Sequence, residues 1–291
     1  MPDAGALPAN TASLEILKPE SLKPILFDSH MHTPLCKHAA GEPEDYAQAG
    51  IRRGLRGVIF TCHNPVPNWG AGVRMAEHEF ETYVAMIERA RVKMSGRVEV
   101  LLGLESDYAP GMESYLEKLH ARAPLNFVLG SVHPQLVEYR ARYFAGDPLA
   151  FQRTYFSHLA EAAETGLFDC LSHPDLVKNI FPRTWDIALL LDHIRAVLDR
   201  IAKTGVAMEL NTSGLQKAIE EMNPGPIILR EMSARKIPVV IGSDSHMPRR
   251  VGEDFDKACD LLLQAGYTEV NFFIGRKRQT VGIAEAKASL V

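Results

Sequence analysis

The 291-residue chain lacks several features that mark whole classes of protein. It has no apolar run near the roughly 18 residues of a membrane span, and its N-terminal segment contains neither region of a signal peptide. Its net charge of −4 lacks the basic excess that proteins bound along nucleic acid backbones usually carry. We therefore expect a cytoplasmic protein that acts on neither membranes nor nucleic acid.

Cysteine is also scarce. Cys36, Cys62, Cys170 and Cys259 lie far apart and form no C-x-x-C pair. In a chain of this length such cysteines are typical of free thiols in a reducing compartment rather than of a disulfide framework. A hydrophobic content of 46% and a charged content of 23% disfavour a disordered or fibrous chain.

Strand and helix patterns alternate along the chain after residues 1–23, which are interpreted as an N-terminal tail. Seven apolar, β-rich runs are separated by segments with helical spacing, and the clearest helix covers 186–203 with an apolar stripe of 3.6-residue period. Other helices are predicted from Pro43, over about 75–94 and over 147–166, and a strand and helix over 267–290 end the chain. This alternation predicts an α/β fold with a parallel sheet, as one domain over residues 24–291.

Histidine is what the chain has in quantity, and more than half of its 11 histidines fall where a predicted strand ends. The residues at the seven strand ends are His30 and His32, His63, Glu105, His133, His173, Asn211, and Asp244 with His246. The carboxyl ends of barrel strands converge on one face, whereas a doubly wound sheet would spread them along a line. The pattern therefore favours a (β/α) barrel.

These residue types in this pattern predict a metal centre. His30 and His32 point to the same side of their strand because side chains alternate with a period of two, and Asp244 and His246 repeat that spacing. Imidazole and carboxylate ligands suit zinc, iron or manganese, and their number predicts two or three ions, with Glu105 able to bridge a pair. Burying so many ionisable groups as structural residues would be costly. Four histidines inside helical stretches are interpreted as surface or core-edge residues: His78, His120, His158 and His193.

Taken together, these segments resemble the polymerase and histidinol phosphatase superfamily. The chain is most similar to its monofunctional histidinol-phosphatase branch, because "DSHMHTPLCKHA" is close to that branch's opening and "GLFDCLSHPDLVK" and "MELNTSGL" are typical of it. "GLESDY", "LGSVH" and "IGSDSH" follow in the order of the family. The resemblance covers residues 25–275 approximately and implies a distorted (β/α)7 barrel.

The resemblance also implies three ion sites on the residues that match the family's motifs. The first ion would be held by His30, His32, Glu105 and Asp244. The second would share Glu105 and add His133 and His173. The third would be held by His38, His63 and His246.

The implied activity is hydrolysis of a small phosphate monoester, L-histidinol phosphate, in histidine biosynthesis, by a hydroxide held between the ions. Glu105 would hold two ions together, and Asp244 or His246 would pass a proton to the leaving alkoxide. A cation should bind the remaining phosphate oxygen, and Arg74 is a weaker candidate for it. The stronger candidates follow barrel-top segments and are Arg142, Lys178, Arg183 and Arg249.

Two features of the sequence depart from the family's pattern, and three alternative functions remain open. Cys62 stands where relatives commonly have an acid, which removes an expected partner of a ligand, and "EEMNPGP" replaces a stretch that often carries a Tyr-Pro pair. The alternatives are a phosphoesterase for nucleotides, cyclic phosphates or other small esters, an amidohydrolase, and a metal-stabilised module without activity. An amidohydrolase needs only four or five ligands, so it would leave His38, His63 and His246 unexplained.

Overall fold

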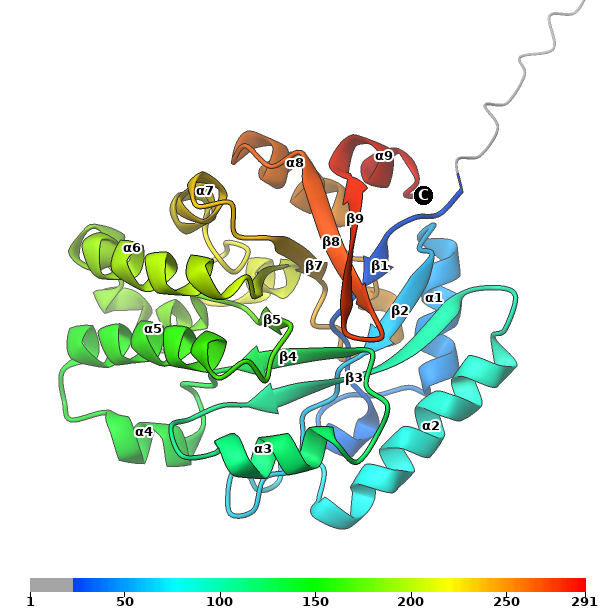
Figure 1. The fold of residues 1–291 in the computed structure, drawn as a ribbon, viewed down its shortest axis with the longest axis horizontal. Coiled ribbons are helices and arrows are strands. Elements are labelled where there is room, and N and C mark those ends of the chain that lie inside the picture. Colours follow the sequence, from blue (N-terminus) through cyan, green and yellow to red (C-terminus); the bar gives the residue numbers. More distant parts are fainter. Residues whose placement is uncertain (1–22) are drawn as a thin grey trace, which may run out of the picture.

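Figure 1 shows the computed structural model of the chain, which describes residues 23–291. Over these residues one sheet of nine strands runs in the order β1 to β9, with β1 to β8 parallel and β9 antiparallel to β8. The predicted tail, residues 1–23, lies outside the described residues except for Lys23.

The order of the elements is the alternation of strands and helices that the sequence predicts. The strands are β1 (Phe27–Asp28), β2 (Gly57–Phe60), β3 (Glu99–Asp107), β4 (Phe127–Ser131), β5 (Cys170–Leu171), β6 (Ala207–Asn211), β7 (Val239–Gly242), β8 (Glu269–Ile274) and β9 (Lys277–Gly282). The α-helices are α1 (Pro43–Arg52), α2 (Phe80–Lys93), α3 (Glu113–His120), α4 (Val137–Tyr143), α5 (Pro148–Glu164), α6 (Ile187–Thr204), α7 (Pro226–Ala234), α8 (Phe255–Gln264) and α9 (Ile283–Ala288).

The seven strands β1 to β7 curve into a distorted barrel. Beyond β1, the backbone N–H of His32 donates to the Ser245 carbonyl (2.9 Å), and the Ser245 N–H donates to the His30 carbonyl (3.1 Å). A single parallel bridge between Met31 and Ser245 thus joins the first strand to the seventh, and no continuous ladder closes the ring among the described residues. The predicted (β/α)7 barrel is confirmed in this distorted, incompletely closed form.

The inward-facing side chains divide the barrel into an apolar floor and a polar top. The floor is a separate core cluster of Phe27, Ile59, Phe127, Leu129, Cys170, Ala207, Val240, Phe272 and Phe273. Because side chains alternate along a strand, the residue two positions after a floor residue also points inward. Ser131 follows Leu129 in this way, and Glu209 follows Ala207. The polar residues therefore lie at the carboxyl ends of the strands, above a dry floor.

The helices α1, α2, α5 and α6 form where the sequence predicts them, and each buries apolar residues on one face. In α6 the side chain of Asp186 accepts a hydrogen bond from the Ala188 N–H, and Gly205 ends the helix in the left-handed conformation (φ 74°). The helix predicted over 75–94 starts later, because residues 77–79 form a 3₁₀ turn before α2.

The C-terminal segment differs from its prediction as a strand followed by a helix. It contains a β-hairpin, β8 and β9, before α9. The two-residue turn, Gly275 and Arg276, has φ values of 56° and 62°, the combination that a tight hairpin requires. Phe272 on β8 stacks on Phe27 of β1, with ring centroids 4.6 Å apart, so the hairpin covers the floor where the first and seventh strands separate.

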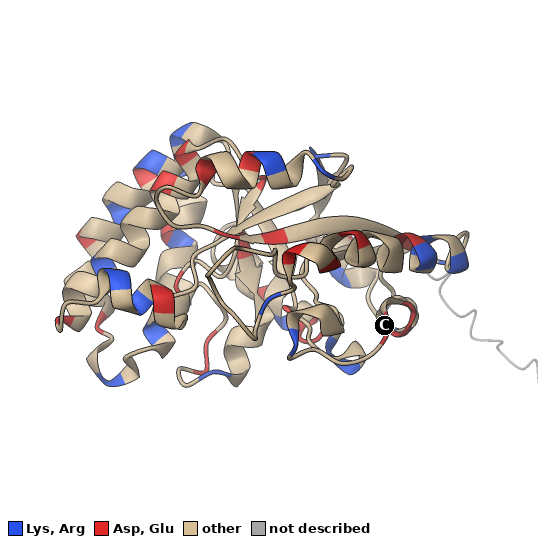
Figure 2. Cartoon of the chain, turned by 90° about the horizontal axis from the view of Figure 1, so that it is seen from below, with Lys and Arg blue, Asp and Glu red and all other residues tan. Residues whose placement is uncertain are grey.

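Charges of both signs are mixed along the outer helices (Figure 2). Some join neighbouring helices: Arg200 on α6 donates to Glu164 on α5 (2.7 Å), and Arg195 on α6 donates to Glu231 on α7 (2.8 Å). Exposed ion pairs of this kind contribute little to stability, so the packed apolar faces hold the helices in place. Within residues 23–291, no helix combines the length and apolarity needed to cross a bilayer.

Candidate metal centre

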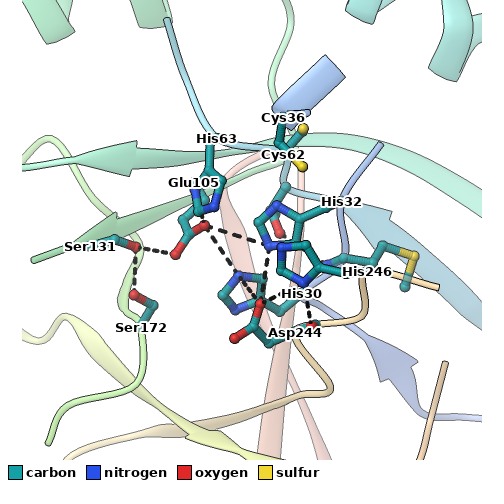
Figure 3. A network of polar contacts seen from close by, with 12 residues as sticks. His30, His32, Cys36, Cys62, His63, Glu105, Ser131, Ser172, Asp244 and His246 are labelled. Atoms are coloured by element: carbon teal, nitrogen blue, oxygen red, sulfur yellow. Dashed lines mark hydrogen bonds and ion pairs between the residues drawn. The ribbon is translucent and has the colours of Figure 1, made fainter. Parts of the chain in front are cut away.

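Glu105, on the inner face of β3, lies at the centre of the polar top (Figure 3). Its Oε2 atom is 3.5 Å from His30 Nε2 and 3.6 Å from His32 Nε2. Its Oε1 atom is 3.2 Å from His133 Nε2 and 3.0 Å from His173 Nε2. Oε2 also lies 2.6 Å from His63 Nδ1. The two oxygens of one buried carboxylate therefore face two different sets of imidazoles, which is the geometry of a bridging ligand.

Asp244 completes the group around Glu105 Oε2. Its Oδ1 atom lies 3.1 Å from His32 Nε2 and 3.7 Å from His30 Nε2, and the three residues hold their donor atoms within 4.8 Å of one another. Asp244 adopts a left-handed backbone conformation (φ 51°) at the end of β7. A non-glycine residue in that region costs about 1–3 kcal/mol and is typical of functional sites.

The histidines of the third predicted ion site lie on the solvent side of the cluster. His63, His246 and His32 bring their donor atoms within 4.8 Å of one another, and so do His38, His246 and Cys36. His38 Nδ1 donates to the Cys36 carbonyl (2.7 Å), and His246 Nδ1 donates to the Asp244 carbonyl (3.0 Å). Both rings therefore keep Nε2 free for a ligand.

Two buried acids that the sequence reasoning missed fix the rings of other histidines. His30 Nδ1 is 2.7 Å from Glu209 Oε1 on β6, and His133 Nδ1 contacts Asp107 Oδ1 on β3. Arg74 in turn donates to both oxygens of Asp107 (2.7 and 3.0 Å). A carboxylate on one ring nitrogen directs the other nitrogen, here Nε2, toward a metal.

The signal for these acids was present in the strand period. Asp107 follows Glu105 by two positions in "GLESDY", and Glu209 precedes Asn211 by two positions in "MELN". Each acid therefore shares the inner face of its strand with a residue already placed at the strand end.

The charges at the site are those of a cation-binding cluster. Burial alone would raise the pKa of Glu105, but the imidazoles of His63 and His30 hold it well below its usual value. Burial alone would lower the pKa of His30, yet the carboxylates of Glu209 and Glu105 raise it well above its usual value. The carboxylates are therefore ionised and available as ligands.

Several donor atoms of the cluster have no hydrogen-bond partner although they are buried. Among the described residues these atoms include His30 Nε2, His32 Nδ1 and His246 Nε2. An unpaired buried polar atom costs about 1–3 kcal/mol, and such atoms are rare in native proteins unless an ion or water satisfies them. The residues present therefore fit a group of metal ions.

The cations predicted for phosphate binding do not line the cavity beside this cluster. Lys178 is fully buried and donates to Asp175 (3.0 Å), and the other three, Arg142, Arg183 and Arg249, lie exposed outside it. Arg74, the weaker candidate, forms a buried ion pair with Asp107.

A cavity of about 190 Å³ opens onto the cluster, and its one lysine was not a candidate. The cavity is lined by His38, His63, His133, Gln135, His173, Leu176, Lys217, Asp244 and His246. Lys217 Nζ donates to Ser213 Oγ (2.7 Å) and lies 3.7 Å from Asp244 Oδ2. Lys217 follows the 3₁₀ turn Thr212–Gln216 after β6, so its position past a strand end was a readable signal.

Three of the four helical histidines are held by hydrogen bonds, and one of them, His193, donates from Nε2 to the Arg153 carbonyl (2.9 Å). His158 is buried against Tyr139, with 2.7 Å between Nδ1 and the hydroxyl, and His120 Nε2 lies 2.8 Å from Ser106 Oγ. His158 is therefore a core residue rather than a surface one.

The fold and the site together define a barrel protein with a centre for several metal ions. The PHP domain matches residues 28–213, and the chain belongs to this family, as the motifs predict. A Deinococcus radiodurans protein named probable histidinol-phosphatase is 38% identical over 258 residues, which are 85% of this chain and 96% of that protein. The histidinol-phosphatase of Bacillus subtilis is 26% identical over 268 residues, covering 79% of this chain and 96% of that protein.

A solved structure supports the fold independently. The histidinol phosphate phosphatase of Lactococcus lactis, in complex with zinc, L-histidinol and phosphate, matches with a TM-score of 0.73 at 20% sequence identity. The match covers 87% of this chain and 98% of that chain, so nearly the whole of that barrel has a counterpart here.

Proposed function

We propose that the protein is a metal-dependent phosphomonoester hydrolase that converts L-histidinol phosphate and water to L-histidinol and phosphate. The observation that carries the proposal is the carboxylate of Glu105, whose two oxygens face separate sets of imidazoles beside a small cavity. The names of the relatives support the choice of substrate, because proteins that match over most of this chain are called probable histidinol-phosphatase or histidinol-phosphatase.

The proposed ligands are the nine residues that the motifs predict. One ion would be held by His30, His32, Glu105 and Asp244, and a second by Glu105, His133 and His173. A third would be held by His38, His63 and His246, whose ring centroids lie 4.6 to 6.2 Å apart. Zinc suits this set of imidazole and carboxylate donors, iron and manganese also bind such sets, and zinc is present in the Lactococcus lactis structure.

The ions would lower the pKa of bound water toward about 7 and neutralise charge on the phosphate. Side chains of the protein would position the reacting groups and transfer the proton. Asp244 Oδ2 accepts a hydrogen bond from Ser213 Oγ (3.0 Å), which orients the carboxyl group at the cavity wall. There the ionised Asp244 carboxylate, or His246 beside it, would take up the proton released by the attacking water and pass it to the leaving alkoxide, each transfer over one hydrogen bond.

Lys217 is the cation that we propose for binding a phosphate oxygen. It lines the cavity, and its partner Ser213 is neutral, so its charge is only partly compensated by Asp244 at 3.7 Å. Lys178, by contrast, is occupied by Asp175 and by the Met222 carbonyl. A charge-assisted hydrogen bond to phosphate contributes about 1.5–3 kcal/mol.

The proposal also concerns the organisation of the chain and its setting. Residues 24–291 act as one barrel domain behind a tail of residues 1–23, in the cytoplasm, on a small phosphorylated molecule. The net charge of −4 and the mixed charges of the outer helices support a small substrate rather than nucleic acid.

The test is a substrate panel run on protein of measured metal content. It includes L-histidinol phosphate, p-nitrophenyl phosphate, a nucleoside monophosphate and a cyclic phosphate. We expect the highest kcat/KM for L-histidinol phosphate, loss of activity in EDTA and its return with zinc or manganese. A clearly higher kcat/KM for another ester would overturn the substrate, and activity in metal-free protein would overturn the proposed chemistry.

A further inference from the structure

Two thiols, Cys36 and Cys62, lie close to His32, beside the third predicted ion site (Figure 3). Cys36 ends the 3₁₀ turn Pro34–Cys36, and Cys62 follows β2, so the fold brings together two cysteines that are 26 positions apart. Both are fully buried and free. Their sulfur atoms and a ring nitrogen of His32 all lie within 4.8 Å of one another.

The two sulfur atoms have different surroundings. Cys62 Sγ accepts hydrogen bonds from the N–H of Thr33 (3.4 Å) and from its hydroxyl (3.2 Å), and Cys62 donates to the Thr33 carbonyl (3.7 Å). Thr33 therefore satisfies Cys62. Cys36 Sγ instead forms a group with the donor atoms of His38 and His246, all within 4.8 Å of one another.

The histidines of that group are oriented for a shared ligand. The Nδ1 atoms of His38 and His246 each donate to a backbone carbonyl, so Nε2 is the nitrogen left on both rings. His246 Nε2 is buried without a hydrogen-bond partner. The turn that carries Cys36 is followed by Lys37 in the left-handed conformation (φ 72°), and this reversal places Cys36 and His38 on the same side.

We infer that Cys36 supplies a sulfur ligand to the third ion, beside His38 and His246. The inference rests on the proposed function only in requiring that an ion occupies this site. A thiolate adds a negative charge and a soft donor to a set of neutral imidazoles. Soft sulfur ligands favour zinc over manganese, so Cys36 would make the third site selective for zinc while the two sites with imidazole and carboxylate ligands remain permissive.

X-ray absorption of the unmodified zinc-loaded protein tests the inference without any variant. We expect a zinc–sulfur component at about 2.3 Å, the usual length of such a bond. A spectrum with only nitrogen and oxygen neighbours would overturn the inference. If such protein still contains metal and hydrolyses the phosphate ester, the proposed function stands and only the sulfur ligand is lost.

Single substitutions then identify the sulfur. Apo-protein is titrated with Co²⁺, and we expect a sulfur-to-cobalt charge-transfer band in the near ultraviolet that disappears in Cys36→Ser. The band should persist in Cys62→Ser, and in Cys170→Ser and Cys259→Ser, which change buried thiols outside the cluster. Loss of the band in Cys62→Ser with retention in Cys36→Ser would overturn the assignment, and circular dichroism checks that each variant is folded.

Zinc affinity gives a second readout. Loss of an outer-shell partner typically lowers metal affinity about 10- to 100-fold, and the loss of a ligand should cost at least as much. In Cys36→Ser we expect zinc at the third site to weaken at least tenfold while manganese changes little. An equal loss for both metals would contradict a role in selectivity.

Discussion

Replacing Glu209 with Gln isolates the contribution of a buried carboxylate that touches no predicted ion. Glu209 Oε1 is 2.7 Å from His30 Nδ1, and both side chains are fully buried. A hydrogen bond to an ionised group contributes about 1.5–3 kcal/mol, which corresponds to about 10- to 100-fold in binding. We therefore expect Glu209→Gln to weaken the first ion about 10- to 100-fold, because Gln keeps the volume but loses the charge.

Calorimetry, or competition with a chelator of known affinity, measures that loss. Glu164→Gln is the matched control, because it makes the same chemical change in an exposed pair with Arg200 on the outer helices. Gly242→Ala should reproduce the effect by another route, since a Cβ there would overlap Glu209 Oε1 and lie 2.6 Å from the Cβ of His30. Wild-type metal affinity in a folded Glu209→Gln variant would refute the reasoning.

The remaining predictions concern phosphate binding by Lys217, metal bridging by Glu105 and the stability of the fold at low pH. Lys217→Ala should lower kcat/KM for the phosphate ester about 10- to 100-fold with metal content unchanged, whereas exposed Arg183→Ala should have no effect; equal kinetics in both would contradict the phosphate role. Glu105→Gln should lower the metal content measured by atomic emission by about one to two ions, because each oxygen faces its own set of imidazoles; full metal content would rule out a bridging role of Glu105. Burial lowers the pKa of His120 and of His158 from 6.5 to about 4. The unfolded chain protonates both imidazoles first, so the stability that they contribute is complete above pH 6.5 and is lost as the pH falls toward about 4. Gln at both positions should flatten the dependence of Tm on pH in that window, and an unchanged slope would show that other groups cause it.

The strand ends could be predicted because they depend on a period of two and on the convergence of parallel strands. Asp244 lies more than 200 positions after His30 and His32, yet the structure brings the donor atoms of the three residues within 4.8 Å of one another. The cations could not be predicted in the same way. Lys178 and Lys217 both follow strands, but Lys178 turns toward buried Asp175 and Lys217 toward the cavity. Loop conformation, which carries no period, decides between the two.

Cys36 eluded prediction for a related reason. Its segment is a turn rather than a strand, and the direction of its side chain depends on the left-handed residue Lys37 that follows. The sequence drew attention to Cys62, and not to Cys36, because relatives commonly have an acid at position 62. In the structure Cys62 Sγ is hydrogen-bonded to Thr33, whereas Cys36 Sγ faces His38 and His246.

The inner face of the barrel explains why Glu209 can reach a histidine on another strand. β6 and β7 are adjacent, with Glu209 opposite Val240 and Asn211 opposite Gly242. Any side chain at Gly242 would occupy the space through which the Glu209 carboxylate passes to His30 beyond β1. The glycine in "IGSDSH" is thus as specific a requirement of the metal centre as the aspartate and histidine that follow it, although it binds nothing.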